Sequence, residues 1–170
     1  MKKLLLGLLI SVGLWSCSDQ EPNPYTGQSL DFELFKSSDF NYSGNLVVQE
    51  LVTGDLEFTI KLDGATSTSS ISYPAHLHFG SYDQADAPIA QLLTPVSGSD
   101  LKSVSVVNTL SDGSKVSFDQ MKNFDGHVKI HLANEGPDYQ VILVAGNVGA
   151  NFNPELGFDP SKITVCGKSF

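Results

Sequence analysis

The stretch GNLVVQELVTGDLEFTIKLDG, residues 44–64, decides the fold class. From Leu56 to Leu62 apolar and polar residues alternate, and this period of two is typical of a strand with one buried face. Three turn-forming residues centred on Gly54 separate this run from the apolar residues that precede it. The stretch therefore predicts a β-hairpin.

The strand pattern continues along most of the chain. Turn sequences rich in Gly, Asp, Asn, Ser and Pro separate the candidate strands. These further strands are expected at residues 73–79, 89–93, 103–109, 126–132, 139–145 and 162–167. Only SFDQMKNF, residues 117–124, has the pattern of a helical turn. About eight strands without helical repeats between them predict an all-β protein: an antiparallel Greek-key β-sandwich or barrel with at most one short helical turn.

The N-terminal sequence MKKLLLGLLISVGLWSC is similar to a bacterial lipoprotein signal peptide. Two lysines precede a short apolar run, and Leu14 and Ser16 stand at the lipobox positions before Cys17. The resemblance implies a signal peptide at residues 1–16 and a lipidated Cys17, whose acyl chains would anchor the protein in a membrane. The polar residues that follow predict a flexible tether at 17–30 and a single domain at 31–170.

The short sequence SDQE, directly after Cys17, is similar to the acidic tags that direct some lipoproteins to the outer surface. We therefore expect the protein at the bacterial outer membrane or cell surface, on its periplasmic or extracellular face. Cys17 and Cys166 are the only cysteines, so lipidation of Cys17 would exclude an intramolecular disulfide. We expect Cys166 to be a buried, inert thiol.

The charge of the chain excludes some partners. It has 19 acidic residues, 10 lysines and no arginine, and a formal charge of −9. Without Lys2 and Lys3 of the leader, eight lysines remain and the charge becomes −11. Nucleic acid is therefore not an expected partner, since arginine is the commonest reader of phosphates and bases. The chain also lacks a glycine-rich phosphate loop and a Gly-X-Ser-X-Gly nucleophile motif, so we expect no nucleotide and no serine hydrolase of that kind. The sequence favours a monomer without enzymatic activity and leaves the question of an enzyme open.

The chain has only four histidines, and they fall in two of the predicted strands: His76, His78, His127 and His131. In YPAHLHFG and GHVKIHL the apolar residues alternate with the histidines. Alternation therefore turns the apolar side chains into the core and all four imidazoles onto the outer, solvent-facing side of the sheet. The usual interpretation of such a pattern is a solvated strand face.

A metal site is the alternative interpretation. Imidazole binds Cu and Zn, and a His-X-His pair needs at least one more ligand. His131 is the candidate third ligand for His76 and His78, and His127 is a further one. Spacing alone leaves open whether the strand of His131 lies beside the strand of the His-X-His pair.

The segment YPAHLHFGSYDQADAPIAQLLTP resembles the first signature of the CHRD family, and FDGHVKIHLANEGPDYQVILVAGNVG resembles its second. The matching residues are His76, His78, Gly80, Pro88 and His131. This resemblance implies a β-sandwich module of an extracellular protein. It implies no particular activity, because a fold hosts many functions.

A fainter resemblance is to Cu/Zn superoxide dismutases. The order of a His-X-His strand, a strand VKIHL, a GNVG stretch and a closing TVCGK strand is similar in the two. This resemblance implies a copper site of three imidazoles, His76, His78 and His131, on the outer wall of a barrel, with His127 as an extra ligand. Dismutase activity itself is not expected, because a charge of −11 repels superoxide and the zinc-site histidines have no counterparts.

Two functions therefore remain open. The first, which the sequence favours, is a lipid-anchored, non-enzymatic surface module that binds a protein or glycan through its loops. The second is a Cu- or Zn-binding protein that uses the histidines. The two differ in one structural requirement, since a metal site needs three imidazole nitrogens that converge on one point at about 2.0–2.1 Å.

Overall fold

A computed structural model describes residues 22–153 and 157–165. The predicted signal peptide, Cys17 and Cys166 lie outside these residues. The strands are β1 (Tyr25–Lys36), β2 (Ser43–Leu51), β3 (Leu56–Asp63), β4 (Ser72–Phe79), β5 (Ile89–Ser97), β6 (Lys102–Val107), β7 (Asp125–His131) and β8 (Ile142–Gly149). The helices are α1 (Phe118–Lys122) and the 3-10 turns η1 (Pro137–Gln140) and η2 (Pro160–Lys162). No helix in the described part of the chain is both long and apolar enough to cross a membrane.

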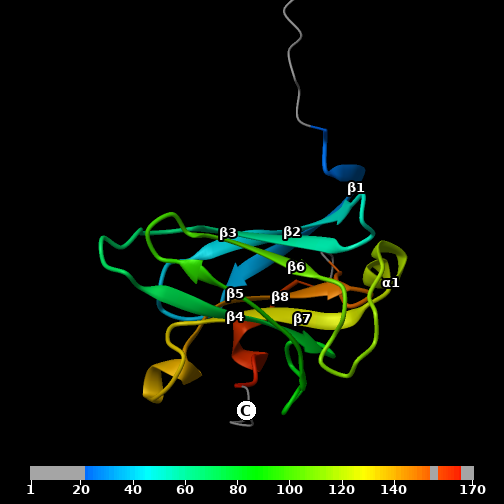
Figure 1. Ribbon diagram of the computed structural model, residues 1–170. Coiled ribbons are helices and arrows are strands. Elements are labelled where there is room, and N and C mark those ends of the chain that lie inside the picture. The colour runs from blue at the N-terminus through cyan, green and yellow to red at the C-terminus, as the bar shows by residue number, and fades with distance from the viewer. Residues whose placement is uncertain (1–21, 154–156, 166–170) are drawn as a thin grey trace, which may run out of the picture.

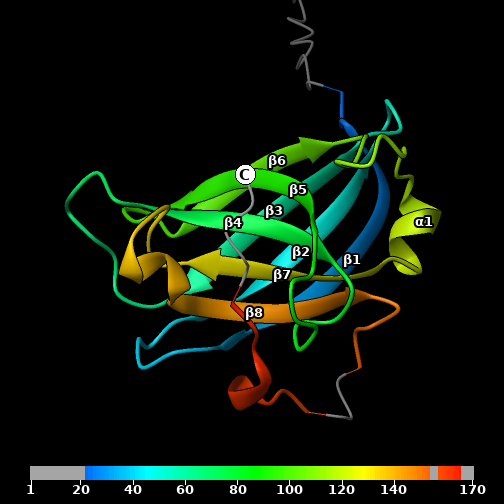
Figure 2. The same ribbon diagram turned by 90° about the horizontal axis from the view of Figure 1, so that it is seen from below.

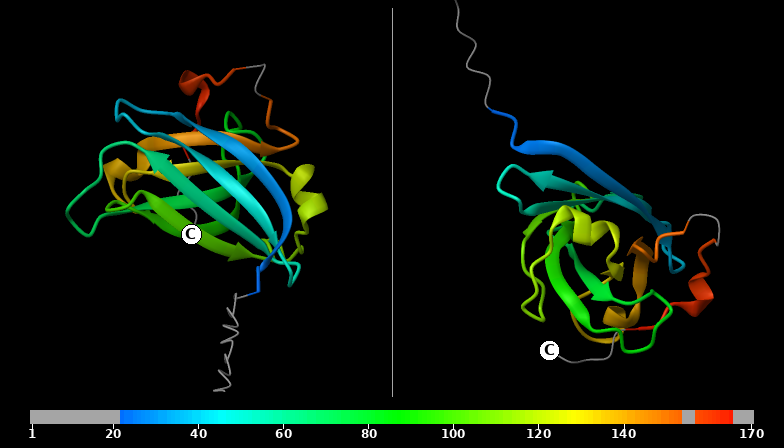
Figure 3. Two further views of the ribbon diagram at one scale, coloured as in Figure 1. Left: turned by 90° about the horizontal axis from the view of Figure 1, so that it is seen from above. Right: turned by 90° about the vertical axis from the view of Figure 1, so that its right-hand side faces the viewer.

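The eight strands form one antiparallel sheet in the order β5-β4-β7-β8-β1-β2-β3-β6. The sheet curls so that β1, β2, β3 and β6 form one layer and β5, β4, β7 and β8 the other (Figure 1; Figure 3 shows the same barrel from above and from one end). Its two edge strands meet, since the Thr94 amide donates to the Ser105 hydroxyl at 2.8 Å. The connections from β3 to β4, from β5 to β6 and from β6 to β7 run between the layers. The predicted Greek-key all-β fold is confirmed as a nearly closed barrel.

The core lies inside this barrel and follows the predicted alternation. Leu56, Phe58 and Ile60 of β3 are at most 1% exposed, as are Leu77 of β4 and Ile130 of β7. The hairpin of β2 and β3 pairs in one continuous register from Ser43–Asp63 to Glu50–Leu56. Burial of these side chains stabilises the fold by about 1.5–3 kcal/mol each.

Three larger differences from the sequence predictions stand out. Strand β1 was not predicted, and it begins at Tyr25, inside the range 17–30 that the sequence assigned to a tether. A strand was expected at 162–167, but η2 occupies its start: Pro160 lacks the amide a strand needs, and the Asp159 carboxylate accepts from the Ser161 amide. The strand expected at 139–145 begins only at Ile142, because its first residues belong to η1. The predicted helical turn is confirmed as α1.

Candidate metal centre

The two histidine-bearing strands lie side by side. β4 and β7 pair antiparallel, with His78 opposite His127 and His76 opposite Lys129. The apolar partners Leu77 and Val128 point into the barrel and are 0% exposed. This register answers the question that spacing left open, because it puts His131 on the same outer face as the His-X-His pair.

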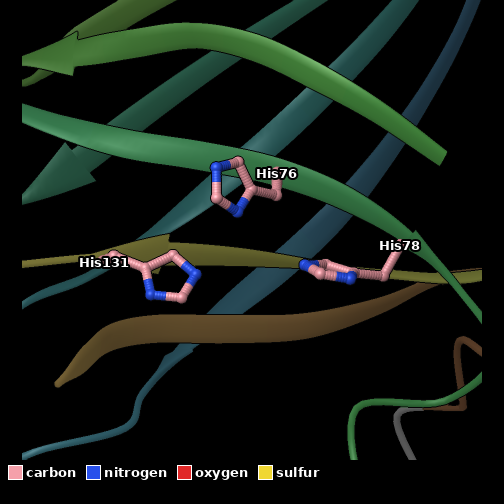
Figure 4. A group of neighbouring side chains, drawn as sticks. All are labelled: His76, His78 and His131. Carbon is pink, nitrogen blue, oxygen red and sulfur yellow. The ribbon is translucent and has the colours of Figure 1, made fainter. Parts of the chain in front are cut away.

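Three of the four histidines converge. His76, His78 and His131 each offer one ring nitrogen, and these nitrogens lie within 4.8 Å of one another. Figure 4 shows the three rings turned toward one space between β4 and β7. Three points at most 4.8 Å apart lie within about 2.8 Å of a common point, so shifts under about 1 Å would give imidazole–metal distances of about 2.0–2.1 Å.

Backbone carbonyls hold two of these rings. His78 Nδ1 lies 3.0 Å from the Ala87 carbonyl, and His131 Nδ1 lies 2.7 Å from the Tyr139 carbonyl. A carbonyl only accepts, so Nδ1 of each ring carries the proton and donates, and Nε2 keeps its lone pair. Metal-binding histidines are commonly oriented by this arrangement.

The prediction that the four imidazoles face solvent is wrong. It placed all four imidazoles toward water, whereas His78, His127 and His131 are 0% exposed and His76 is 5% exposed. The side of the face is as predicted, but other segments cover it. The loop at 80–88 and the turn η1 supply the carbonyls described above, and the C-terminal segment 157–165 approaches from the side of β8 (Figure 2). Alternation along a strand assigns a side chain to a face, and it carries no information about what later covers that face.

Burial keeps these imidazoles neutral. Desolvation, reinforced by the neighbouring histidines, lowers the pKa of His76 and of His78 to about 3. Desolvation also lowers the pKa of His127, to about 4, and lowers the pKa of His131. All four are therefore uncharged at neutral pH, and a neutral imidazole is the form that binds a metal.

His127 lies outside the converging group. Its ring is stacked on that of His78, with ring centroids 4.8 Å apart and an angle of 7° between the planes. Its Nδ1 donates to the Gly80 carbonyl, at 2.6 Å. Its Nε2 is buried, with no hydrogen-bond partner among the described residues. The structure thus places His127 beside a candidate ligand but outside the converging group.

Two residues at the site were given no role by the sequence analysis. Tyr139, 2% exposed, stacks on His131 with centroids 4.4 Å apart and an angle of 7°. Lys129, 1% exposed, donates from Nζ to the Thr164 carbonyl at 2.6 Å and so ties β7 to the C-terminal segment. Alternation did put Lys129 on the histidine face, but Tyr139 arrives from η1, which no periodic pattern indicates.

The donor set fits Cu or Zn. Imidazole nitrogen suits both ions, and three protein ligands leave room for a further ligand or for a three-coordinate ion.

Neither a scan against protein-family models nor searches of curated proteins and of solved structures find a match to this chain. The resemblances to the CHRD family and to Cu/Zn superoxide dismutases therefore stay predictions, and the function is inferred from the geometry of the histidines.

Proposed function

We propose that this protein is an extracytoplasmic metal-binding protein that holds Cu or Zn through His76, His78 and His131. The observation that supports this is the convergence of one nitrogen from each ring within 4.8 Å. A solvated strand face would not need buried imidazoles with fixed tautomers, whereas a metal site does. The geometry thus favours the second of the two functions that the sequence left open.

The proposed role is metal storage or slow redox chemistry. Fast dismutation of superoxide is not part of the proposal, because the negative chain slows the approach of an anion and the imidazoles are covered. A lipid anchor at Cys17 belongs to the proposal as well, since it would hold the metal site at the membrane surface.

The test is metal analysis of the mature chain, residues 17–170, carrying Cys17→Ser. After incubation with Cu or Zn and gel filtration, we expect one metal ion per chain. A His76→Ala, His78→Ala double variant should lose that ion. His127→Gln is the matched control, because His127 lies outside the converging group and the variant should keep one ion per chain. Equal metal content in the mature chain and the double variant would contradict the proposal.

The anchor has its own test. In cells, the full-length chain should fractionate with membranes, and Cys17→Ser should release it or leave it with an uncleaved leader. A protein that stays soluble whether or not Cys17 is present would contradict the anchor without touching the metal site.

A cleft supports the first function, ligand binding at the surface, as a second candidate. It has a volume of about 390 Å³ and is lined by parts of β1, β8, the loop after β4 and the C-terminal segment. Phe35 and Phe158 stack in its wall at 4.8 Å, beside Tyr82. Fixed aromatic faces with neighbouring amides and carboxylates suit a glycan or a peptide. Phe158→Ala should abolish retention on any glycan or peptide column that retains the mature chain, and retention without change would remove this candidate.

A further inference from the structure

We propose that the His76, His78, His131 site selects monovalent copper, Cu⁺, over Zn²⁺ and Cu²⁺. This inference rests on the proposed metal-binding function and names the ion that the site prefers. Three features carry it: the number and charge of the ligands, an aromatic ring that covers the fourth position, and the lack of acidic residues on the two flanking strands, β5 and β8.

The ligand set is small and neutral. Three imidazoles form the group, and within the described residues no carboxylate or thiol belongs to it. Zn²⁺ in proteins takes four ligands, and Cu²⁺ prefers a tetragonal set of nitrogens and oxygens. Zn²⁺ and Cu⁺ both have a filled d shell, so they differ here in charge and in ligand number: Cu⁺ is stable with three nitrogens alone, whereas Zn²⁺ needs a fourth ligand.

A buried aromatic ring lies beside the fourth position. The Tyr139 ring lies flat against His131, at 4.4 Å and 7°, and its centroid is 6.4 Å from that of His76. His127 does not supply a fourth nitrogen in this arrangement. Its ring is nearly parallel to His78 at 4.8 Å, and imidazole lone pairs lie in the ring plane, so the two rings do not aim at one ion. The ligands are 0–5% exposed, so bulk solvent does not contact them freely.

The two flanking strands, β5 and β8, carry no acidic residue that would compensate a double charge. On the outer faces of the flanking strands, Leu92 pairs with His76 and Asn147 pairs with His127, and both are uncharged. Between the histidines of β7 stands a cation, Lys129. The cost of burying an ion grows with the square of its charge, so a dication costs about four times as much as Cu⁺ in the same site. Burial therefore discriminates against Zn²⁺ and Cu²⁺.

The experiment is a competition titration on the mature chain carrying Cys17→Ser and Cys166→Ser, so that no thiol contributes. Cu⁺ affinity is measured anaerobically against bicinchoninate, and Zn²⁺ and Cu²⁺ affinities against chromophoric chelators. We expect Cu⁺ to bind at least about 100-fold more tightly than either dication, because three ligands are too few for Zn²⁺ and Cu²⁺ and because burial of a dication costs more. Equal or tighter binding of Zn²⁺ or Cu²⁺ would overturn this inference and leave the metal-binding function standing. Failure of all three ions to bind would instead overturn the proposed function, and this inference with it.

A variant pair at Tyr139 tests the cause of the preference. Tyr139→Ala should open the fourth position to water and narrow the preference for Cu⁺ over Zn²⁺ by about tenfold, within the range known for residues that contact metal ligands. Tyr139→Phe keeps the stacked ring and should keep the preference. Circular dichroism shows whether the alanine variant folds, and if it does not, the comparison of ions on the parent chain still decides the inference. An unchanged preference in folded Tyr139→Ala would overturn the role given to the covered position.

Discussion

The two faces of β4 and β7 are equally buried and chemically opposite. Toward the barrel, Leu77, Val128 and Ile130 are 0% exposed and form part of the core. Away from it, His78 and His131 are also 0% exposed. The inner face is covered by the other layer of the same sheet, and the outer face is covered by loops and by the C-terminal segment.

The inner face therefore contributes to the stability of the fold, and the outer face is the candidate functional surface. Burial of apolar side chains stabilises a fold, whereas burial of imidazoles costs free energy unless hydrogen bonds or a bound ligand offset it. Carbonyls of the covering segments bond to Nδ1 of His78 and His131, and in our proposal a metal ion bonds to Nε2. The outer face therefore has the properties of a binding site held in a stable barrel.

Lowering the pH should have the largest effect on stability, and this effect arises from the outer face, because that face carries the buried histidines. In the metal-free folded protein, burial lowers the pKa of His76 and His78 to about 3 and that of His127 to about 4, against 6.5 for an exposed histidine. Below pH 6.5 the unfolded chain takes up protons that the folded chain does not. The free energy of unfolding should thus be greatest above pH 6.5 and fall by about 2 kcal/mol for each of these three histidines by pH 5. Urea denaturation at pH 7 and pH 5 measures this.

A control isolates one histidine in this pH dependence. His127→Leu keeps the site buried and removes one titrating group, so the loss of stability between pH 7 and pH 5 should shrink by about 2 kcal/mol. An unfolding free energy that stays constant or rises between pH 7 and pH 5 would contradict the buried, neutral state of these histidines.

Leu77 lies on the inner face, and in the sequence it stands between the proposed ligands His76 and His78. Leu77→Ala therefore tests the inner face. The substitution leaves a cavity in the barrel core, and the free energy of unfolding should fall by about 2–5 kcal/mol. Its effect on metal content and on the pH dependence should be small, because the side chain points away from the imidazoles. A Leu77→Ala variant that folds but no longer binds metal would show that the two faces are coupled more tightly than their separation suggests.

The sequence predicted the fold through local patterns. Alternation from Leu56 to Leu62 predicted the hairpin, and alternation around His76 and His131 placed the histidines on one face of each strand. Strand β1 was missed although its second half shows the same alternation, with Leu30, Phe32 and Leu34 packed in the core. Its first half, from Thr26 to Ser29, is polar and exposed, so that part resembles a tether. What makes it a strand is pairing with β2 and β8, and that pairing is not local.

The sequence predicted which residues form the site, but it did not predict that other segments bury them. His76, His78 and His131 were the expected ligands, but their burial depends on residues far away in the sequence. Thr164 bonds to β7, and Ala87 bonds to His78 across a loop with no periodic pattern. Contacts of this kind depend on how the covering segments pack, and no residue spacing encodes them.

Thr164→Val tests the C-terminal segment 157–165, which covers part of the histidine face. It removes the bond from the Thr164 hydroxyl to the Gln84 carbonyl, 2.6 Å long, and should lower the free energy of unfolding by about 1 kcal/mol. The looser segment should also speed metal uptake, measured by stopped-flow absorbance. Ser161→Ala is the matched control, because its hydroxyl bonds only within an exposed turn, and it should change neither quantity. Identical uptake rates in both variants would mean that the segment does not limit access.

The measurement that tests the metal centre most directly is X-ray absorption spectroscopy of the mature chain loaded with one equivalent of copper under reducing conditions. Three converging imidazoles predict a first shell of nitrogen alone, at about 2.0 Å, with the outer-shell scattering of three imidazole rings. A first shell that contains sulfur, or fewer than three imidazoles, would contradict the site formed by His76, His78 and His131.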